Sequence, residues 1–302
     1  MGRVGSNRAM NSRLGLGVGM AALGAVGFSG KAIIVKLAYR HGVDAVTLLM
    51  WRMLLALPLF VALAWWAGRD QPRLLGRDWR DIALLGFTGY YLASFLDFAG
   101  LQYISASLER LILYLNPTLV LLISVLLLKA PVQRRQLLAL GLSYGGVLLV
   151  FAHELRFEGR ATLIGSALVL GSAISYAIYL VRSGEVLKRI GTLRLTGLAS
   201  SVACGFCIGQ FLLLRPLAAV QVPEPVFWLS LINATACTFA PVLLVMLAIA
   251  RIGAPLAAQA GMVGPMSTLI LAALLLDEPL TVWVLAGTAL VLVGVAVLAR
   301  KR

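Results

Sequence analysis

The stretch LNPTLVLLISVLLLKAPV (115–132) decides the fold of this chain, because it returns 148 residues later as VGPMSTLILAALLLDEPL (263–280). The match extends on both sides, so that 95–154 lies over 243–302 without a gap. Matching leucines carry little information in a hydrophobic chain, whereas coincident prolines and glycines mark backbone features that both copies keep. Three such pairs coincide: Pro117 with Pro265, Pro131 with Pro279, and Gly146 with Gly294. The chain therefore contains two copies of one unit.

Composition indicates a membrane protein. Of 302 residues, 61% are hydrophobic and 13% are charged, and the mean hydropathy is +0.94, whereas soluble domains are about 25% charged. A helix of about 20 apolar residues crosses the hydrocarbon layer with its backbone hydrogen bonds satisfied internally. We therefore predict an all-α membrane protein with ten transmembrane helices. The apolar windows are 14–38, 44–66, 81–102, 105–128, 136–152, 161–182, 192–214, 225–249, 254–276 and 280–299.

The two units are predicted to be inverted. The first covers 14–152 and the second 161–300, with five windows in each. Because five is an odd number of crossings, the second unit must enter the membrane from the opposite face. Such a 5+5 inverted repeat is an architecture of secondary transporters, whose substrate site lies near the midplane between the halves.

The distribution of basic residues predicts the orientation. The chain has 26 Lys and Arg against 12 Asp and Glu, a net charge of +14. With a cytoplasmic N-terminus, 18 of the 26 lie at or beyond the cytoplasmic ends of the windows, five lie at or beyond the other ends, and Lys31, Arg52 and Arg110 lie deep inside windows. This bias places both termini in the cytoplasm, so the basic surplus marks topology and not a nucleic-acid surface. The first window resembles a signal peptide but is longer than a signal core, and we interpret it as the first helix.

The three cysteines and the glycines of the first window are interpreted as packing residues. Cys204, Cys207 and Cys237 fall inside windows, and an odd set of buried cysteines predicts no disulfide framework. Small residues let membrane helices approach closely, and Gly15, Gly19, Gly24, Gly27 and Gly30 of the first window are interpreted in this way.

Three segments resemble a known family. GFSGKAIIVKLAYRHGVDAVTLLMWRMLLALP (27–58) is similar to the opening of EamA-domain proteins of the drug/metabolite transporter superfamily, and 103–124 and 253–280 resemble their fourth and ninth helices. The resemblance implies a ten-helix alternating-access transporter in a superfamily that contains bacterial amino-acid exporters, the YddG type among them. Glu278 matches the acidic residue that commonly ends the ninth helix, but its counterpart in the first copy is Ala130. The two halves are therefore not expected to gate equivalently.

Charged residues inside the windows are candidate functional groups because they are costly there. Asp97 and Arg110 lie about equally far from the tight turn near Tyr103, and hence at one depth on antiparallel helices. We predict that they pair. The pair either holds the hairpin in register or breaks during transport.

Lys31, Arg52 and Glu109 fall at a similar depth, so that five charges form one belt with a net charge of +1. A surplus cation suits the carboxylate of an amino acid. In the alternative, Lys31 pairs with Glu109 and packs the first helix against the fourth.

Polar side chains that converge on apolar walls predict a small-molecule cavity. Deep tyrosines need partners and should point inward, and amides and hydroxyls from several windows accompany them; helix–helix hydrogen bonding is the competing role. Together with Lys31 and Glu109, the predicted substrate-binding residues are Tyr90, Ser94, Tyr114, Asn116, Tyr176, Tyr179, Asn233, Thr238, Gln259 and Met262.

Pro117 and Pro265 lie near the centres of the fourth and ninth windows. Each removes a backbone hydrogen bond, so we predict that both helices kink there and that the gate lies at these kinks.

Enzyme motifs fail on inspection. The stretch 25–32 imitates a phosphate loop but begins with Ala25 and lacks a hydroxyl residue after Lys31. Gly27-Phe-Ser29-Gly30 imitates an intramembrane serine protease, which needs a histidine base, and the chain has only His41 and His153, both predicted in loops. No enzymatic activity, metal or cofactor is expected.

The predicted function is a secondary transporter that exports small metabolites across the inner membrane, with amino acids, aromatic or otherwise apolar, as the expected substrates. A lipid or lipid-linked-intermediate flippase of the same fold is the alternative, followed by an intramembrane serine protease. The expected partners are the substrate and the lipid bilayer, with no nucleic acid; a homodimer is compatible but not required. Asp97 and Glu109 are the only deep carboxylates, so proton coupling would have to involve one of them.

Overall fold

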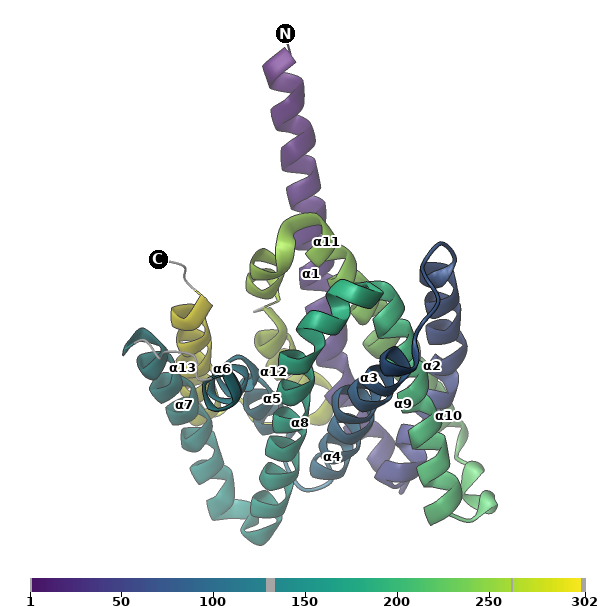
Figure 1. Cartoon of the computed structure of the whole chain (residues 1–302). Coiled ribbons are helices and arrows are strands. Elements are labelled where there is room, and N and C mark those ends of the chain that lie inside the picture. The colour runs from purple at the N-terminus through teal and green to yellow at the C-terminus, as the bar shows by residue number, and fades with distance from the viewer. Residues whose placement is uncertain (1, 129–133, 262, 300–302) are drawn as a thin grey trace.

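A computed structural model describes residues 2–128, 134–261 and 263–299. It describes the backbone alone for 2–14, 124–128, 135, 156–158, 185, 250, 253–259 and 298–299. Within these ranges every regular element is helical (Figure 1). The prediction of an all-α chain is confirmed.

Five spans form the first unit, and the third and fourth of them are each assembled from consecutive helices. The elements are α1 (Gly2–Tyr39), α2 (Ala45–Gly68), α3 (Gly76–Leu85), the π-helix η1 (Gly86–Leu92), α4 (Ala93–Gly100), α5 (Ala106–Leu113), α6 (Asn116–Leu128) and α7 (Arg134–Glu158).

The second unit follows the same order with two differences: a 3₁₀ turn, η2, precedes its third span, and one helix, α11, takes the place of α4 and α5. Its elements are α8 (Arg160–Ile190), α9 (Thr192–Leu214), η2 (Leu217–Val220), α10 (Glu224–Ala234), the π-helix η3 (Thr235–Phe239), α11 (Ala240–Ala260), α12 (Val263–Leu276) and α13 (Val282–Ala299).

The described residues contain eight helices long and apolar enough to cross a membrane, and two shorter apolar helices, α12 and the Val282–Val297 part of α13. Together they give the ten predicted spans. One boundary differs from the prediction of a ninth helix over 254–276, because α11 continues to Ala260 and α12 begins at Val263. The helix continues through Gly253 and Pro255 and is interrupted at Gly261.

Packing between the units follows a twofold pattern. α1 packs against α11 and α12, and its counterpart α8 packs against α4, α5 and α6. α2 packs on its counterpart α9, and α7 packs on its counterpart α13. Exchanging the units preserves these contacts, and equivalent helices run in opposite directions because each unit has an odd number of spans. The architecture is therefore the predicted inverted repeat.

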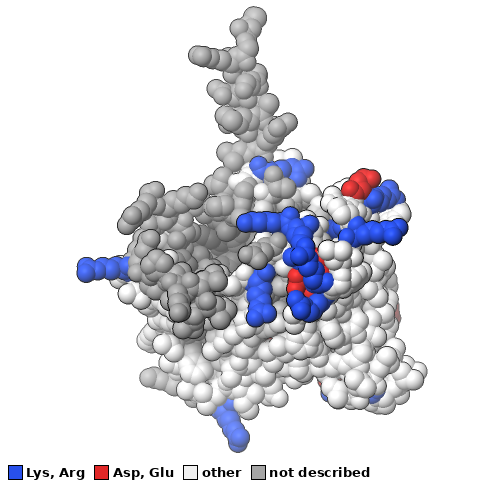
Figure 2. Space-filling model, viewed as in Figure 1, with Lys and Arg blue, Asp and Glu red and all other residues white. Residues whose placement is uncertain are grey.

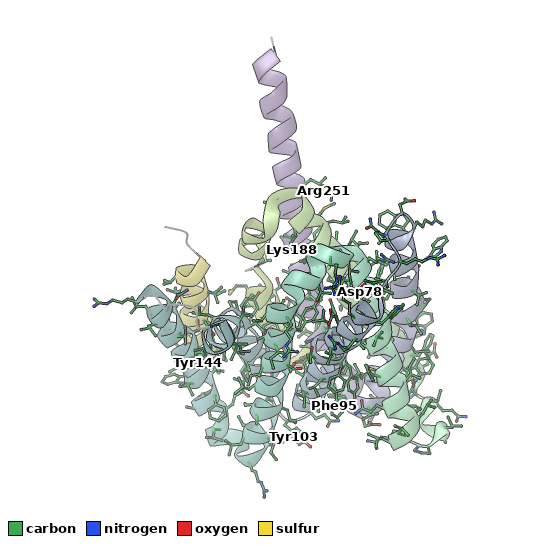
Figure 3. All side chains as sticks on the ribbon, in the orientation of Figure 1. Asp78, Phe95, Tyr103, Tyr144, Lys188 and Arg251 are labelled. Carbon is green, nitrogen blue, oxygen red and sulfur yellow. The ribbon has the colours of Figure 1, made fainter. Side chains whose placement is uncertain are left out.

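The bundle has two distinct ends. α1 starts and α13 finishes at one end, which we call the terminal end (Figure 1). Asp78, Lys188 and Arg251 lie toward this end, whereas Tyr103 lies at the other, which we call the opposite end (Figure 3). Lysine and arginine side chains gather toward the terminal end (Figure 2). The charge asymmetry of the sequence is thus also an asymmetry in space.

At the opposite end, Asp44 sets the start of α2. Its carboxylate accepts hydrogen bonds from the backbone amides of Val46 and Thr47 and forms an ion pair with Arg215 at 3.1 Å. Burial opposes ionisation of this carboxyl, but the hydrogen bonds from Thr47 and Arg215 outweigh it and lower the pKa of Asp44. The loop before α2 is therefore tied to the end of α9.

Both units carry the same backbone irregularities. An offset of 148 residues places 86–92, the π-helix η1, over 234–240, which contains η3. In the next span, the helix is interrupted at Tyr114 and Leu115 in the first unit and at Gly261 in the second. Pro117 is the second residue of α6 and Pro265 the third residue of α12, so each proline opens a new helix where its missing amide costs no hydrogen bond.

The paired glycines of the sequence repeat lie where α7 crosses α13. A Cβ atom on Gly146 would lie 2.5 Å from the carbonyl oxygen of Gly287, and a Cβ on Gly294 would collide with Ser143. Because the obstacles include backbone atoms, a side chain at these positions would push the helices apart. Both copies keep glycine because each lies at this inter-unit crossing.

Candidate functional site

A cavity of about 600 Å³ lies between the two units. Its walls come from α1, α2, η1, α4, α5 and α6 of the first unit and from α8, α9, η3 and α11 of the second. Along α1, residues from Ala21 to Lys31 line it, and none of the residues after Lys31 does. The cavity thus extends from the level of Lys31 toward the terminal end.

A second cavity, of about 570 Å³, lies at the opposite end. Lys36, Tyr39 and Arg40 at the end of α1 line it, together with Glu278 and residues of α5 and α7. Only the 32–35 stretch of α1 separates the two sets of lining residues.

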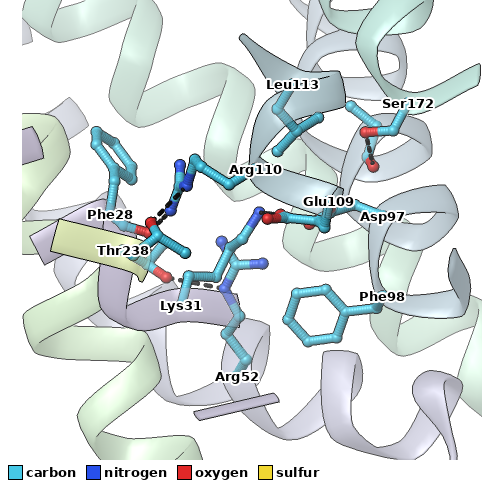
Figure 4. Close-up of polar contacts among 12 residues, drawn as sticks. Phe28, Lys31, Arg52, Asp97, Phe98, Glu109, Arg110, Leu113, Ser172 and Thr238 are labelled. Atoms are coloured by element: carbon cyan, nitrogen blue, oxygen red, sulfur yellow. Dashed lines mark hydrogen bonds and ion pairs between the residues drawn. The ribbon is translucent and has the colours of Figure 1, made fainter. Parts of the chain in front are cut away.

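An ion cluster lies at the bottom of the first cavity (Figure 4). The Lys31 ammonium pairs with Asp97 and, at 3.2 Å, with Glu109. Asp97 is 2% exposed and Glu109 is fully buried. The predicted contact of Lys31 with Glu109 is present, and the same lysine joins α1, α4 and α5.

The predicted pair of Asp97 with Arg110 is wrong. Arg110 instead donates from Nε to Thr268 Oγ1 at 2.8 Å and from Nη2 to the carbonyl of Phe28 at 2.7 Å. Counting residues from the turn gives depth but not rotation. Successive residues of a helix are turned by about 100°, so Glu109 faces Lys31 whereas Arg110 is directed toward α12.

Arg52 reaches the cavity from α2. Its Nε donates to Thr238 Oγ1 in η3 at 2.8 Å, and its guanidinium lies over the ring of Phe98, 5.1 Å from the centroid. Arg52 is 7% exposed and Arg110 is 9% exposed. Among the described side chains, neither arginine forms an ion pair with a carboxylate.

Most predicted substrate-binding residues line this cavity. They come from both units and reach it at several levels along the spans. The predicted residues that line it are Lys31, Tyr90, Ser94, Tyr114, Asn116, Tyr176 and Thr238, and the predicted ion-pair residues Arg52, Asp97 and Arg110 line it as well.

Other predicted site residues do not line the cavity. Glu109 lies behind Lys31. Tyr179 is covered by Tyr90, with the two hydroxyls 3.1 Å apart. Asn233 is fully buried, and its amide has no hydrogen-bond partner among the described residues. Met262 and the side chain of Gln259 lie outside the described residues.

Three tyrosines form an aromatic wall where η1 meets α8. The ring of Tyr179 stacks on Tyr176 with centroids 5.4 Å apart, and meets Tyr90 edge-on at 5.3 Å. Such arrangements fix ring positions without further polar contacts. Tyr90 and Tyr176 of this wall line the cavity, and Tyr179 backs them.

The two interrupted helices meet across the cavity. The Tyr114 hydroxyl donates to the carbonyl of Gly261 at 3.0 Å, so the break of one span is bonded to the break of the other. A Cβ on Gly264 would lie 2.5 Å from this hydroxyl. Carbonyls freed by interruption of a helix thus find a side-chain partner, as membrane burial requires.

Several lining residues were not foreseen from the sequence. Most are apolar, and an apolar residue carries no signal in a chain that is apolar nearly throughout. They include Phe28, Met53, Phe60, Val245, Met246 and Ile249, with the small polar residues Ser172 and Ser200. Ser172 donates a hydrogen bond to the carbonyl of Ala93. Which side of α8 faces this carbonyl depends on the rotation of the helix about its axis, which the sequence does not give.

Ser29 of the protease-like motif has a structural role. Its side chain is buried, and its single hydroxyl proton is shared between the carbonyls of Ala25 at 2.9 Å and Gly264 at 2.8 Å; the contact with Gly264 ties α1 to α12. His41 lies in the turn after α1, and His153 stacks on Trp283. The hydrogen bonds described for this serine go to backbone carbonyls and not to a histidine.

At the opposite end, Glu278 joins the two units. Its carboxylate accepts hydrogen bonds from the amide of Ala106 at 2.7 Å, the amide of Ser107 at 3.1 Å and the Ser107 hydroxyl at 2.7 Å. Ser105, the residue before α5, also contacts Glu154 of α7. A carboxylate at a helix N-terminus is favoured by the free amides and the helix dipole.

An inverted repeat of membrane helices with a cavity between its halves is the architecture of a secondary transporter. The family model of the EamA-like transporters matches residues 15–152 and 163–300. The chain belongs to the EamA-like transporter family, and it is a multi-pass membrane transporter.

Relatives agree with this assignment. The chain is 30% identical over 265 residues to "Uncharacterized transporter YcbK" of Bacillus subtilis, covering 85% of this chain and 84% of that protein. It is 27% identical over 200 residues to an "Uncharacterized transporter" of Archaeoglobus fulgidus, covering 66% and 67%. A solved crystal structure has a TM-score of 0.60 with 20% identity, covering 97% of this chain and 99% of the other. That likeness concerns the fold.

Proposed function

We propose that this transporter exports amino acids, with apolar or aromatic ones favoured, across the inner membrane by alternating access between its two units. The observation that carries the proposal is the inter-unit cavity. Its lining joins an aromatic wall and aliphatic side chains to a cluster of charged groups. Cavities with apolar walls and a few placed polar groups are suited to small amphipathic molecules.

The orientation rests on the basic residues. They favour the terminal end in space and the predicted cytoplasmic side in sequence (Figure 2), which supports cytoplasmic termini. The cavity then extends toward the cytoplasm, where an exporter loads its substrate. The family resemblance favours export and amino acids.

Counterflow into proteoliposomes tests the proposal. Vesicles loaded with unlabelled amino acid should accumulate the same labelled amino acid, whereas protein-free vesicles should not. A panel of labelled amino acids ranks the substrates. Uptake of none of them, together with movement of a fluorescent short-chain phospholipid between leaflets, would replace this proposal by the flippase.

A cavity-filling variant links transport to the site. Ser94 lines the cavity, whereas Leu213 on α9 is 85% exposed toward the surroundings of the bundle. Ser94→Phe should abolish counterflow, and Leu213→Phe, which adds an aromatic ring at an exposed position, should leave it intact. Equal transport by both variants would show that the substrate does not use this cavity.

A further inference from the structure

The carboxylates at the cavity pair with only one of its three cationic side chains. The two buried carboxylates, Asp97 and Glu109, both contact Lys31. Arg52 and Arg110 line the same cavity, and among the described side chains no carboxylate contacts either of them. The cations available to a ligand are therefore the two arginines, whereas Lys31 is already paired.

Arg52 is held in place with part of its guanidinium unused. Thr238 accepts from Nε, and Phe98 covers one face. Nη1 is buried and has no hydrogen-bond partner among the described residues. A buried donor without an acceptor is costly, and a ligand oxygen would satisfy it.

Arg110 is likewise anchored by neutral groups. Its Nε and one terminal nitrogen donate to Thr268 and to the carbonyl of Phe28. Neutral acceptors fix the direction of the side chain without cancelling its charge. The guanidinium thus retains its full positive charge at the cavity wall.

The sum of charges at the site favours an anionic group on the ligand. Lys31, Arg52 and Arg110 carry +3 and the two carboxylates carry −2, so the ionised site carries +1. An uncompensated charge inside a membrane protein is expensive. A carboxylate group on the ligand would compensate this positive charge locally, and planar guanidinium groups match carboxylate oxygens in geometry.

Three of the charged groups at the cavity have apolar counterparts in the second unit. At the offset of 148 residues, the counterparts of Asp97, Glu109 and Arg110 are Val245, Ala257 and Ala258. Val245 lines the cavity together with Met246 and Ile249. A bound molecule would place its anionic group toward the first unit and its apolar part toward α11.

We propose that Arg52 and Arg110 form an anion subsite that binds one carboxylate of the substrate, and that Lys31 does not contact this carboxylate. The inference rests on the proposed function for the identity of the substrate, but the subsite itself is defined by the two arginines. The sequence alone suggested a belt of charges around Lys31 with one surplus cation; in this proposal the two arginines bind the carboxylate instead.

Binding to the purified full-length protein in nanodiscs tests the subsite. The probes are L-phenylalanine, 3-phenylpropionate and L-phenylalaninamide, of which only the amide lacks a carboxylate. The variants are Arg52→Gln and Arg110→Gln, and the control is Arg251→Gln at an exposed arginine that donates to Leu247 within its own helix. Both carboxylates should bind at least tenfold more tightly than the amide in the parent and in the control.

In each cavity variant the affinity for the carboxylates should fall about 10- to 100-fold, as expected for loss of hydrogen bonds to a charged group, while the amide is unaffected. Equal binding of amide and carboxylates by the parent, or unchanged carboxylate affinity in both variants, would overturn the subsite. If the glutamine variants do not fold, Thr238→Val and Thr268→Val keep both charges but remove their anchors. These should weaken carboxylate binding selectively, and unchanged binding in both would refute the proposal.

Benzoate, acetate and inorganic phosphate separate failure of the subsite from failure of the proposed function. Should neither phenylalanine nor phenylpropionate bind, the amino-acid proposal fails. Thermal stabilisation of the parent by benzoate or acetate, absent in Arg52→Gln and Arg110→Gln, would then still support the subsite. Stabilisation by phosphate alone would replace the carboxylate by a phosphate, and stabilisation by none of the anions would overturn the subsite.

Discussion

Replacement of Glu278 by alanine should open the opposite end of the transporter. Glu278 belongs to the second unit, and its carboxylate binds the first turn of α5 in the first unit. The first cavity, which we call the main cavity, extends from Lys31 toward the terminal end. In this conformation the units are therefore joined at the opposite end, where Glu278 lies. Alternating access requires that they separate there, which breaks these hydrogen bonds.

The size of the effect follows from the contacts that are lost. A side chain that caps a helix N-terminus contributes about 0.5–2 kcal/mol, and hydrogen bonds to charged groups about 1.5–3 kcal/mol each. Glu278 is only partly buried, and water replaces part of what alanine removes. We therefore take about 2 kcal/mol for all three bonds together, which shifts the equilibrium between the two forms by about 30-fold.

Cysteine accessibility measures this shift. In a background where the three native cysteines are replaced by alanine, Ser94→Cys places a reporter in the main cavity. A membrane-impermeant maleimide is applied from the side that Glu278 faces. Its labelling rate is proportional to the population open on that side, so Glu278→Ala should raise the rate by about 30-fold.

Glu224→Ala is the matched control. Glu224 also lies at the start of a span of the second unit and carries the same charge, but the side-chain hydrogen bond described for it comes from Trp228 of its own helix. It should leave the labelling rate unchanged. A rate for Glu278→Ala equal to that of the parent, or an equal rise in both variants, would show that the Glu278 contacts do not hold this end closed.

Three further outcomes are expected. Lys31→Met should lower the free energy of unfolding by about 3 kcal/mol, because it leaves two buried carboxylates without a cation; an unchanged melting temperature in detergent would contradict this. Asp97→Asn and Glu109→Gln should each flatten the pH dependence of transport, and two parental profiles would exclude proton coupling through these groups. Gly146→Val should destabilise by about 1–3 kcal/mol through the α7–α13 crossing, whereas Gly141→Val, where a Cβ meets nothing within 4 Å, should melt like the parent.

The fold was largely predictable because membrane spans and repeats leave strong signals in a sequence. Ten windows, two units and their inversion follow from hydropathy, coincident prolines and an odd number of crossings. The π-helices and the continuation of α11 to Ala260 were not predicted. Such features depend on how backbone groups find partners within packed spans, and no single residue type marks them.

The candidate site was predictable in its polar members and not in its contacts. Tyr90, Tyr114 and Thr238 stand out because polar groups are rare in the spans, and all three line the cavity. The partner of Asp97 was wrong because the rotation of α5 about its axis cannot be read from the distance along the chain. Apolar lining residues such as Met246 were missed because they resemble the residues that face lipid.

An inverted repeat makes the two end states of a transporter nearly equivalent, and the departures from symmetry then decide how they differ. Here the departures fall at two levels. The ionisable cluster belongs to the first unit, since Asp97 and Glu109 have apolar counterparts in the second, and the joining carboxylate Glu278 has Ala130 as its counterpart. The scaffold supplies two conformations. The Glu278 contacts stabilise only the one in which the Glu278 end is closed, so they influence which conformation is more populated. The ionisable cluster determines where a charged substrate is held.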